Sequence, residues 1–121
     1  MRLTMMKSKL HRIHVTNADL DYEGSFTLDP DLMEAANLLP HERVEIYNVT
    51  GGSRLATYVI EGTRGSREAQ ANGAAAHLIR PDDIVIIVSY AEMSPEEAKE
   101  HVPKVVLVDA ENEPLGESLP A

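Results

Sequence analysis

Alternation of apolar and polar positions predicts that most of this chain is β-strand. Residues 3–15 mix apolar with basic side chains and contain few strand breakers, which favours one long, partly exposed strand. Residues 44–50 and 54–60 each alternate, and the Gly-Gly pair at 51–52 suits a tight turn, so this region is typical of a β-hairpin. The β-branched run at 84–88 indicates a strand that is buried on both faces.

Two short helices and two further strands complete the predicted pattern. Asp29 is a typical N-cap before Pro30, and apolar residues then recur at helical spacing. Ser94 opens a capping-box sequence that predicts a short acidic helix. Short strands are expected at 25–28 and 104–110. About six strands with short helices, and no regular β-α-β alternation, predict a mainly β fold: a small closed six-stranded barrel.

Composition narrows the class of protein. The 121 residues suit a single domain, 1–121, in which the acidic segment from about 111 to 121 is expected to be a loose tail. No apolar run approaches the ~18 residues of a membrane helix, and basic residues interrupt the N-terminal segment, which predicts a soluble, cytoplasmic protein with no membrane partner. The absence of Cys excludes disulfides and a thiol nucleophile. A net charge of -9 argues against a nucleic-acid partner.

Spacing alone offers little chemistry. His11 and His14 form the one close histidine pair, but three positions apart on a strand they face opposite sides, so no metal site is predicted. Ser25 lacks a G-x-S-x-G elbow, which argues against a conventional serine hydrolase. Arg54 and Tyr58 share one face of their predicted strand, where they are either simple surface neighbours or part of a site.

Four separated segments carry a specific resemblance. The stretches "KLHRIHVTNADLDYEGS", "RLATYVIEGTRGS", "NGAAAH" and "DDIVII" resemble the pyruvoyl-dependent aspartate 1-decarboxylase family in both residue identity and spacing. The resemblance runs without a gap from about Met1 to about Pro103. It implies a double-psi β-barrel, which agrees with the strand-rich pattern, and a homotetramer with active sites between subunits.

The resemblance also implies an unusual cofactor. The Ser25 hydroxyl would attack the carbonyl of Gly24, and the chain would cut itself into a small chain, 1–24, and a large chain, 25–121. Ser25 would become a covalent pyruvoyl group, whose ketone condenses with the amine of L-aspartate and accepts the electron pair left when carbon dioxide departs. The product would be β-alanine for pantothenate synthesis, made without pyridoxal phosphate and without a metal.

Roles for individual residues follow from the same resemblance. Tyr58 would return a proton to the substrate α-carbon, and Arg54 would bind a substrate carboxylate. Processing would depend on four residues: Gly24, Ser25, Thr57 and Asn72. Substrate binding would involve Lys9, His11, Arg54, Thr57, Gly73, Ala74 and Ala75.

Two positions depart from the resemblance. Phe26 places a bulky ring directly after the scissile bond, where smaller residues are common, and this is expected to alter self-cleavage. Tyr47 stands where many family members have Trp, and we expect it to keep the packing role. An accessory activator protein is compatible with the resemblance but has no signature in the sequence. The alternative from another class is a non-enzymatic β-barrel that serves as a binding or assembly module.

Overall fold

The protein is mainly β, as the sequence predicted. A computed structural model describes residues 1–118 of the chain. The strands are β1 (Leu3–His14), β2 (Asn17–Asp19), β3 (Ser25–Leu28), β4 (Arg43–Asn48), β5 (Arg54–Glu61), β6 (Ala69–Asn72), β7 (Ile84–Met93), β8 (Lys104–Val108) and β9 (Pro114–Ser118), and the helices are α1 (Pro30–Ala35), the 3-10 helix η1 (Gly73–His77) and α2 (Pro95–Glu100). Within the described residues, no helix has the length and apolar character needed to cross a bilayer.

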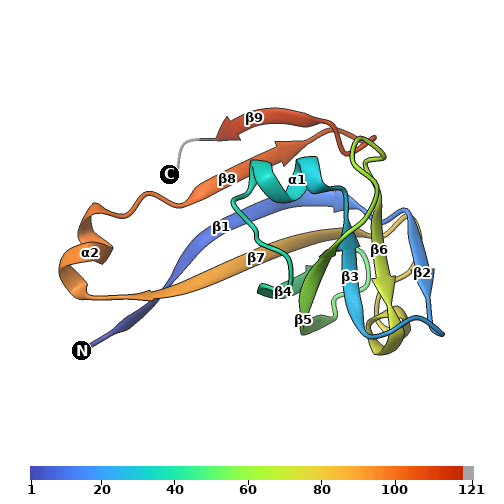
Figure 1. Cartoon of the computed structure of the whole chain (residues 1–121), viewed down its shortest axis with the longest axis horizontal. Coiled ribbons are helices and arrows are strands. Elements are labelled where there is room, and N and C mark those ends of the chain that lie inside the picture. Colours follow the sequence, from blue (N-terminus) through green and yellow to red (C-terminus); the bar gives the residue numbers. More distant parts are fainter. Residues whose placement is uncertain (119–121) are drawn as a thin grey trace.

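All nine strands of the described chain join in one continuous sheet. Its order is β2-β6-β3-β5-β4-β7-β1-β8-β9, and it coils into the body of the molecule (Figure 1). This arrangement is compatible with the predicted small β-barrel. The strand count exceeds six because β2, β6 and β9 were not predicted. These strands are only three to five residues long, too short for a clear periodic signal, and β2 and β6 also pair with strands distant in sequence. The hairpin of β4 and β5 lies where it was predicted.

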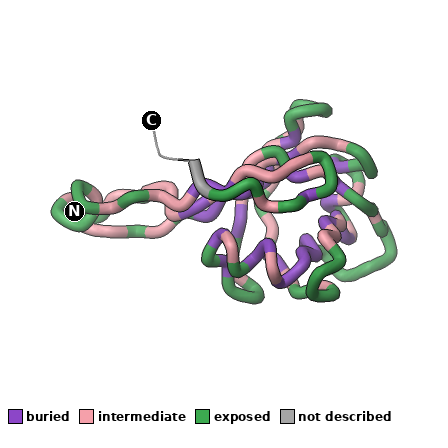
Figure 2. Tube along the Cα trace, turned by 90° about the horizontal axis from the view of Figure 1, so that it is seen from above, coloured by how far each residue is buried: buried purple, intermediate pink, exposed green. Residues whose placement is uncertain are grey.

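The hydrophobic core lies in this body. Buried residues concentrate there, whereas the segment that projects from it is coloured mostly as intermediate or exposed (Figure 2). Most of the largest side chains that are fully buried come from five strands and α1; they include Phe26, Leu10, Ile13, Leu28, Leu32, Ile46, Val59 and Ile87. Burial of such aliphatic and aromatic side chains is the main source of stability for a domain of this size.

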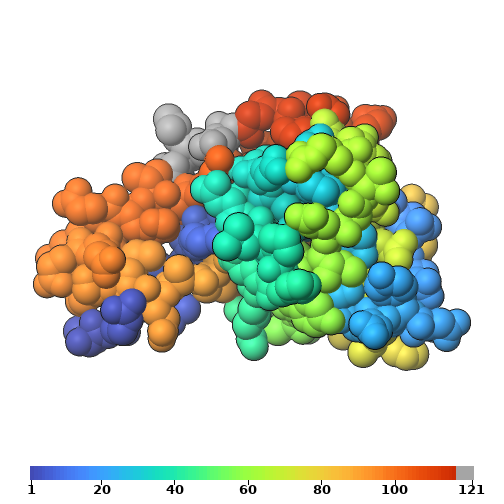
Figure 3. Space-filling view, viewed as in Figure 1, coloured from blue at the N-terminus to red at the C-terminus, as the bar shows by residue number. Residues whose placement is uncertain are grey.

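A two-stranded arm extends from the body. The first half of β1 pairs with the second half of β7, from Leu3 opposite Met93 to Ser8 opposite Ser89, and α2 covers the far end (Figures 1 and 3). The predicted capping box is confirmed, since the Ser94 side chain accepts from the Glu97 amide and the Glu97 side chain accepts from the Ser94 amide. No residue of α2 is buried, so the arm has little core of its own.

The acidic C-terminal segment, predicted as a loose tail, contributes strand β9 and specific side-chain contacts. β9 pairs with β8 in antiparallel fashion, and the Asn112 side chain is 1% exposed. The Asn112 amide donates to the carbonyls of His14 and Arg67, and Glu113 forms an ion pair with the Arg67 guanidinium. The acidic composition alone did not reveal these contacts, and residues 119–121 lie outside the described chain.

Candidate active site

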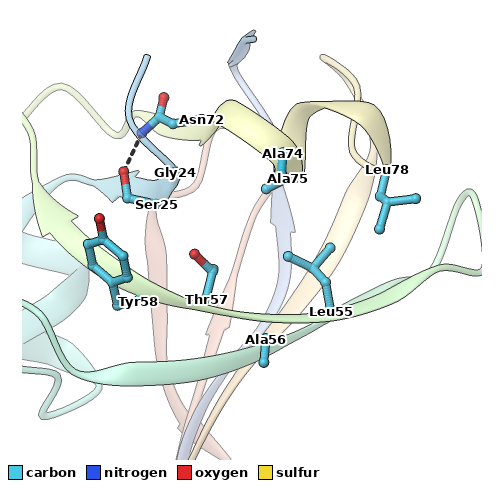
Figure 4. Close-up of a pocket in the computed structure, with 10 residues that line it drawn as sticks. All are labelled: Gly24, Ser25, Leu55, Ala56, Thr57, Tyr58, Asn72, Ala74, Ala75 and Leu78. Atoms are coloured by element: carbon cyan, nitrogen blue, oxygen red, sulfur yellow. Dashed lines mark hydrogen bonds between the residues drawn. The ribbon is translucent and has the colours of Figure 1, made fainter. Parts of the chain in front are cut away.

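A pocket opens beside the Gly24–Ser25 bond. It encloses about 330 Å³, a volume in the range of small-molecule sites. The residues that line it are Gly24, Ser25, Leu55, Ala56, Thr57, Tyr58, Asn72, Ala74, Ala75 and Leu78 (Figure 4). They come from the start of β3, the middle of β5, the end of β6 and η1. Seven of the predicted site residues therefore line one cavity. Gly73, the first residue of η1, does not line it.

Ser25 is held in place by two hydrogen bonds. Its side chain is almost fully buried, and its hydroxyl donates to the Glu23 carbonyl at 3.1 Å. The same oxygen accepts from Asn72 Nδ2 at 3.0 Å (Figure 4). Ser25 and Asn72 also lie opposite each other in the β3–β6 ladder, which explains why an asparagine 47 residues away reaches this hydroxyl.

The tightest packing at the scissile bond falls on Gly73 rather than Gly24. A Cβ atom added at Gly24 would meet no atom within 4 Å, so the structure gives no steric reason for a glycine there. Gly73 has φ = +62°, and a Cβ on it would lie 2.8 Å from Gly24 Cα and 2.9 Å from both Gly24 N and the Tyr22 carbonyl. Only glycine therefore lets η1 approach the scissile segment this closely.

Strand β5 brings two hydroxyl groups to the pocket. Thr57 and Tyr58 both project towards Ser25 (Figure 4). Tyr58 is partly exposed, and its ring lies 6.4 Å from that of His41, centroid to centroid. These hydroxyls and the Asn72 amide are the polar side-chain groups that face Ser25, and apolar residues form most of the remaining wall.

Asp29 anchors both strands that meet at Ser25. It follows β3 directly, caps α1 by accepting from the Asp31 amide, and is fully buried. It also accepts from the backbone amides of Gly65 and Arg67 and from the Arg67 guanidinium, in the loop that leads into β6. Burial would raise the pKa of Asp29, but these hydrogen bonds outweigh it and lower the pKa below its usual value. The ionised carboxylate thus fixes the loop before β6 to the end of β3.

Arg54 does not reach the pocket within its own chain. Its guanidinium carbon lies 4.8 Å from the centre of the Tyr47 ring, a cation–π contact with its cross-strand neighbour. The Tyr47 hydroxyl in turn bonds that of Tyr90 at 2.7 Å. This bond, followed by burial, raises the pKa of Tyr90 to about 12. Arg54 is thus engaged by the Tyr47 ring and does not line the pocket beside Ser25.

Lys9 and His11 are also outside the lining of the pocket. Both lie on β1, which is separated from β5 in the sheet by β4 and β7. Burial, followed by the charges of Lys9 and Arg12, lowers the pKa of His11. The imidazole is therefore mainly neutral near pH 7 and contributes little positive charge.

The histidine spacing on β1 is less simple than an unbroken strand implies. A β-bulge interrupts the pairing between Leu10 and Ile13, and Arg12 there has φ = +68°. Counting positions therefore does not fix the relative directions of His11 and His14. Among the described residues, no three His, Cys, Asp or Glu side chains are grouped as metal ligands.

The pocket carries no charge of its own. None of the ten lining residues in the described chain has an acidic or basic side chain. The groove at the outer side of β4 and β7, by contrast, is lined by Arg43, Glu45 and Glu92 together with Tyr90. A charged ligand in the pocket beside Ser25 would therefore depend on hydroxyl, amide and backbone groups within this chain.

Comparison with known proteins identifies the family. A family model described as "Aspartate decarboxylase" matches residues 1–115. The chain belongs to the aspartate decarboxylase family. Proteins named aspartate 1-decarboxylase are similar along nearly their whole length: that of Maricaulis maris is 56% identical over 112 residues, covering 93% of each chain. The Caulobacter vibrioides protein is 53% identical over 112 residues, 93% of this chain and 95% of its own. The Thermoanaerobacter pseudethanolicus protein is 53% identical over 115 residues, which cover 95% of this chain and 98% of its own.

Membership of the aspartate decarboxylase family confirms the resemblance found in the sequence. The match extends beyond Pro103, where that resemblance became weak, to residue 115. Of the two unusual positions, Phe26 is fully buried in the core directly after Ser25. Tyr47 packs beneath the Arg54 guanidinium.

Two residues next to the site escaped the sequence analysis. Thr27 Oγ1 accepts from Asn72 Nδ2 at 2.7 Å, and Gln70 Nε2 donates to Asn72 Oδ1 at 2.7 Å. Each lies two positions from a predicted site residue on the same strand, so both project from the face that carries Ser25 and Asn72. The alternation of side chains along β3 could be predicted from the sequence. β6 was not predicted as a strand, so nothing in the sequence indicated that it pairs with β3.

Proposed function

We propose that this chain is a self-processing pyruvoyl enzyme that converts L-aspartate to β-alanine and carbon dioxide. The observation that carries the proposal is the Gly24–Ser25 bond at the wall of a small-molecule pocket, with the Ser25 hydroxyl anchored by Asn72. Relatives that cover nearly the whole chain bear the name aspartate 1-decarboxylase. The product would serve pantothenate synthesis in the cytoplasm.

Self-processing begins with the Ser25 hydroxyl. Its oxygen attacks the Gly24 carbonyl carbon, the C–N bond breaks, and the amide becomes an ester with a free amine on residue 25. Loss of the α-proton expels the Gly24 carboxylate, which cuts the chain, and water then replaces the nitrogen of residue 25, which leaves as ammonia. Asn72 orients the attacking oxygen, and Gly73 allows η1 to pack against the scissile segment.

The surroundings of residue 25 fit a pyruvoyl group. Asn72 Nδ2 is a donor aimed at this position, and the Thr57 and Tyr58 hydroxyls border the same cavity. The group supplies an acceptor for the electron pair that carbon dioxide leaves behind. We assign the return of a proton to the substrate α-carbon to the Tyr58 hydroxyl. The backbone of Gly73, Ala74 and Ala75 would bind a substrate carboxylate, and the apolar wall limits access of water.

A second copy of the chain is part of the proposal. L-Aspartate carries two carboxylates, and the pocket lining contributes no cation. Arg54 and Tyr58 are four residues apart on β5, which separates their Cα atoms by about 13 Å. We infer that Arg54 and Lys9 reach the pocket of a neighbouring subunit in a homotetramer, with His11 beside them. The projecting arm has little hydrophobic core of its own, so its surface is available for contact with a neighbouring subunit.

Intact-mass measurement tests the proposal. The purified protein should separate under denaturing conditions into fragments 1–24 and 25–121, the larger of which begins with a pyruvoyl group. L-Aspartate should then be decarboxylated without added pyridoxal phosphate. Ser25→Ala should remain full-length and inactive.

The chain contains its own matched control. Gly65–Ser66 is another Gly-Ser pair, but Ser66 lies in an exposed turn and its hydroxyl donates to the Thr63 carbonyl. Ser66→Ala should therefore cut itself normally and remain active. Decarboxylation by a chain that is never cut, or by Ser25→Ala, contradicts the proposed function.

A further inference from the structure

Four polar side chains share one face of the β3–β6 pair. Ser25 lies opposite Asn72, and Thr27 lies opposite Gln70, in an antiparallel ladder. Because alternate residues of a strand face the same side, these four side chains form a compact square. Asn72 is fully buried, and Ser25 and Thr27 are at most 9% exposed, so the hydrogen bonds of Asn72 to Ser25 and Thr27 are buried, whereas its bond to Gln70 is partly buried.

The Asn72 amide joins the whole square. Its Nδ2 group donates to Ser25 Oγ at 3.0 Å and to Thr27 Oγ1 at 2.7 Å. Its Oδ1 atom accepts from Gln70 Nε2 at 2.7 Å. Hydroxyl groups donate or accept equally well, so neither Ser25 nor Thr27 determines which end of the amide faces them. Gln70 is the one member of the square whose amide distinguishes the two ends.

The orientation of this amide decides where the Ser25 hydrogen points. With Nδ2 towards Ser25, the hydroxyl oxygen accepts from Asn72, and its hydrogen is directed to the Glu23 carbonyl. With the amide reversed, Oδ1 would face the hydroxyl and draw its hydrogen away from Glu23. The two orientations therefore present different rotamers of the Ser25 hydroxyl to the Gly24 carbonyl.

We propose that Gln70 is a positioning residue for self-cleavage: by donating to Asn72 Oδ1, it keeps Asn72 Nδ2 directed at the Ser25 hydroxyl. This inference rests on the proposed function, since it concerns the rate at which the Gly24–Ser25 bond is cut. Gln70 is not itself a lining residue of the pocket, and it acts through Asn72, which is.

Two variants with side chains of similar length test this role: one replaces the Gln70 donor with an acceptor, and the other keeps a donor. Gln70→Glu presents only acceptor oxygens when ionised, so it favours the reversed Asn72 amide. Gln70→Lys presents only donors, so it favours the orientation seen here. The experiment follows cleavage of newly made, uncut protein by intact mass at pH 7.5, for variants whose circular dichroism matches that of wild type. We expect Gln70→Glu to cleave at least tenfold more slowly than wild type, and Gln70→Lys to stay within about threefold of it.

Acid provides a rescue that a purely structural role would not produce. Protonation gives the glutamate a donor, so the ratio of the Gln70→Glu rate to the wild-type rate should rise as the pH is lowered from 7.5 towards 5. If Gln70→Glu does not fold, Gln70→Leu replaces it and should cleave more slowly than Gln70→Lys.

Equal cleavage rates of the Glu and Lys variants, whether both fast or both slow, overturn the inference, as does a ratio that stays constant with pH. If Gln70→Leu stands in for the Glu variant, a rate equal to that of Gln70→Lys has the same meaning. A wild-type chain that is never cut overturns the proposed function and this inference with it. A wild-type chain that is cut while the variants are indistinguishable overturns the role of Gln70 alone.

Discussion

Gly73 combines an unusual backbone conformation with a close contact to the scissile segment. Its φ of +62° costs an L-residue roughly 1–2 kcal/mol, and a Cβ there would lie 2.8 Å from Gly24 Cα. We expect Gly73→Ala to fold but to displace the Gly24–Ser25 bond, so that self-cleavage slows at least tenfold. The measurement is the fraction of uncut chain against time, by intact mass.

Gly52 provides a control that separates the cost of positive φ from the close contact with Gly24. It also has positive φ, at +81°, but a Cβ added there meets no atom within 4 Å. Gly52→Ala should therefore lose a comparable amount of stability and still cut itself at the wild-type rate. Equal slowing in both variants would mean that general destabilisation, not the approach to Gly24, limits cleavage.

The family resemblance predicted which residues lie together better than strand geometry did. Ser25, Thr57, Tyr58 and Asn72 meet at one pocket as the family resemblance implied. Arg54 shares a predicted strand face with Tyr58 but does not line that pocket, because its side chain lies on the neighbouring Tyr47 ring. Alternation gives the direction of a side chain but not the distance it must span.

At the level of elements, the buried Asp29 carboxylate links β3, α1 and the loop before β6. Asp29→Asn keeps the size but loses the charge that accepts from the Gly65 and Arg67 amides and pairs with the Arg67 guanidinium. We expect a loss of about 1.5–3 kcal/mol in the free energy of unfolding. Urea denaturation of the uncut Ser25→Ala background measures it without interference from cleavage.

The effect of Asp29 should vanish in acid. Its pKa in the folded protein is lowered, so its contribution is fully present above the unfolded pKa of about 4 and is lost as the pH falls through the folded value. The stability difference between wild type and Asp29→Asn should shrink below about pH 4. Asp31→Asn is the control: its carboxylate is more than one-third exposed, so it should cost less than about 1 kcal/mol. A difference that is constant with pH contradicts the role given to the Asp29 charge.

Elements with a complete local signal were predictable, and elements defined by distant partners were not. The long first strand, the hairpin and both helix caps carry their patterns within a few residues, and the structure confirms them. β6, with the sequence Ala-Gln-Ala-Asn, has no such pattern. It is a strand because β2 and β3 lie on either side of it, and this pairing delivers Asn72 to Ser25.

At the scale of the whole molecule, the uncharged pocket requires cations from elsewhere. If a neighbouring subunit supplies Arg54, two inactive variants should complement each other when co-expressed. Ser25→Ala provides an intact Arg54, and Arg54→Ala provides an intact Ser25. With equal, random mixing, one half times one half of the sites contain both intact residues, so about a quarter of wild-type decarboxylase activity should return.

Two substitutions in residues that the same chain contributes to one pocket serve as the control for this co-expression experiment. Tyr58 and Ser25 line one cavity within one chain. Co-expression of Ser25→Ala with Tyr58→Phe should therefore add no activity beyond that of Tyr58→Phe alone. If Arg54→Ala and Ser25→Ala also fail to complement each other, Arg54 acts within its own subunit or not at all.

The position of β1 affects how the protein folds before cleavage and refolds after it. β1 lies inside the sheet, antiparallel to β7 and parallel to β8, and it contributes Leu10 and Ile13 to the core. After a cut between Gly24 and Ser25, this strand would be held only by non-covalent contacts. Before the cut, the peptide bond keeps it at an effective concentration that separate fragments in dilute solution do not reach. The scissile bond would therefore act first as a folding tether, and a mature enzyme that is unfolded and diluted should recover poorly, because the tether has already been consumed.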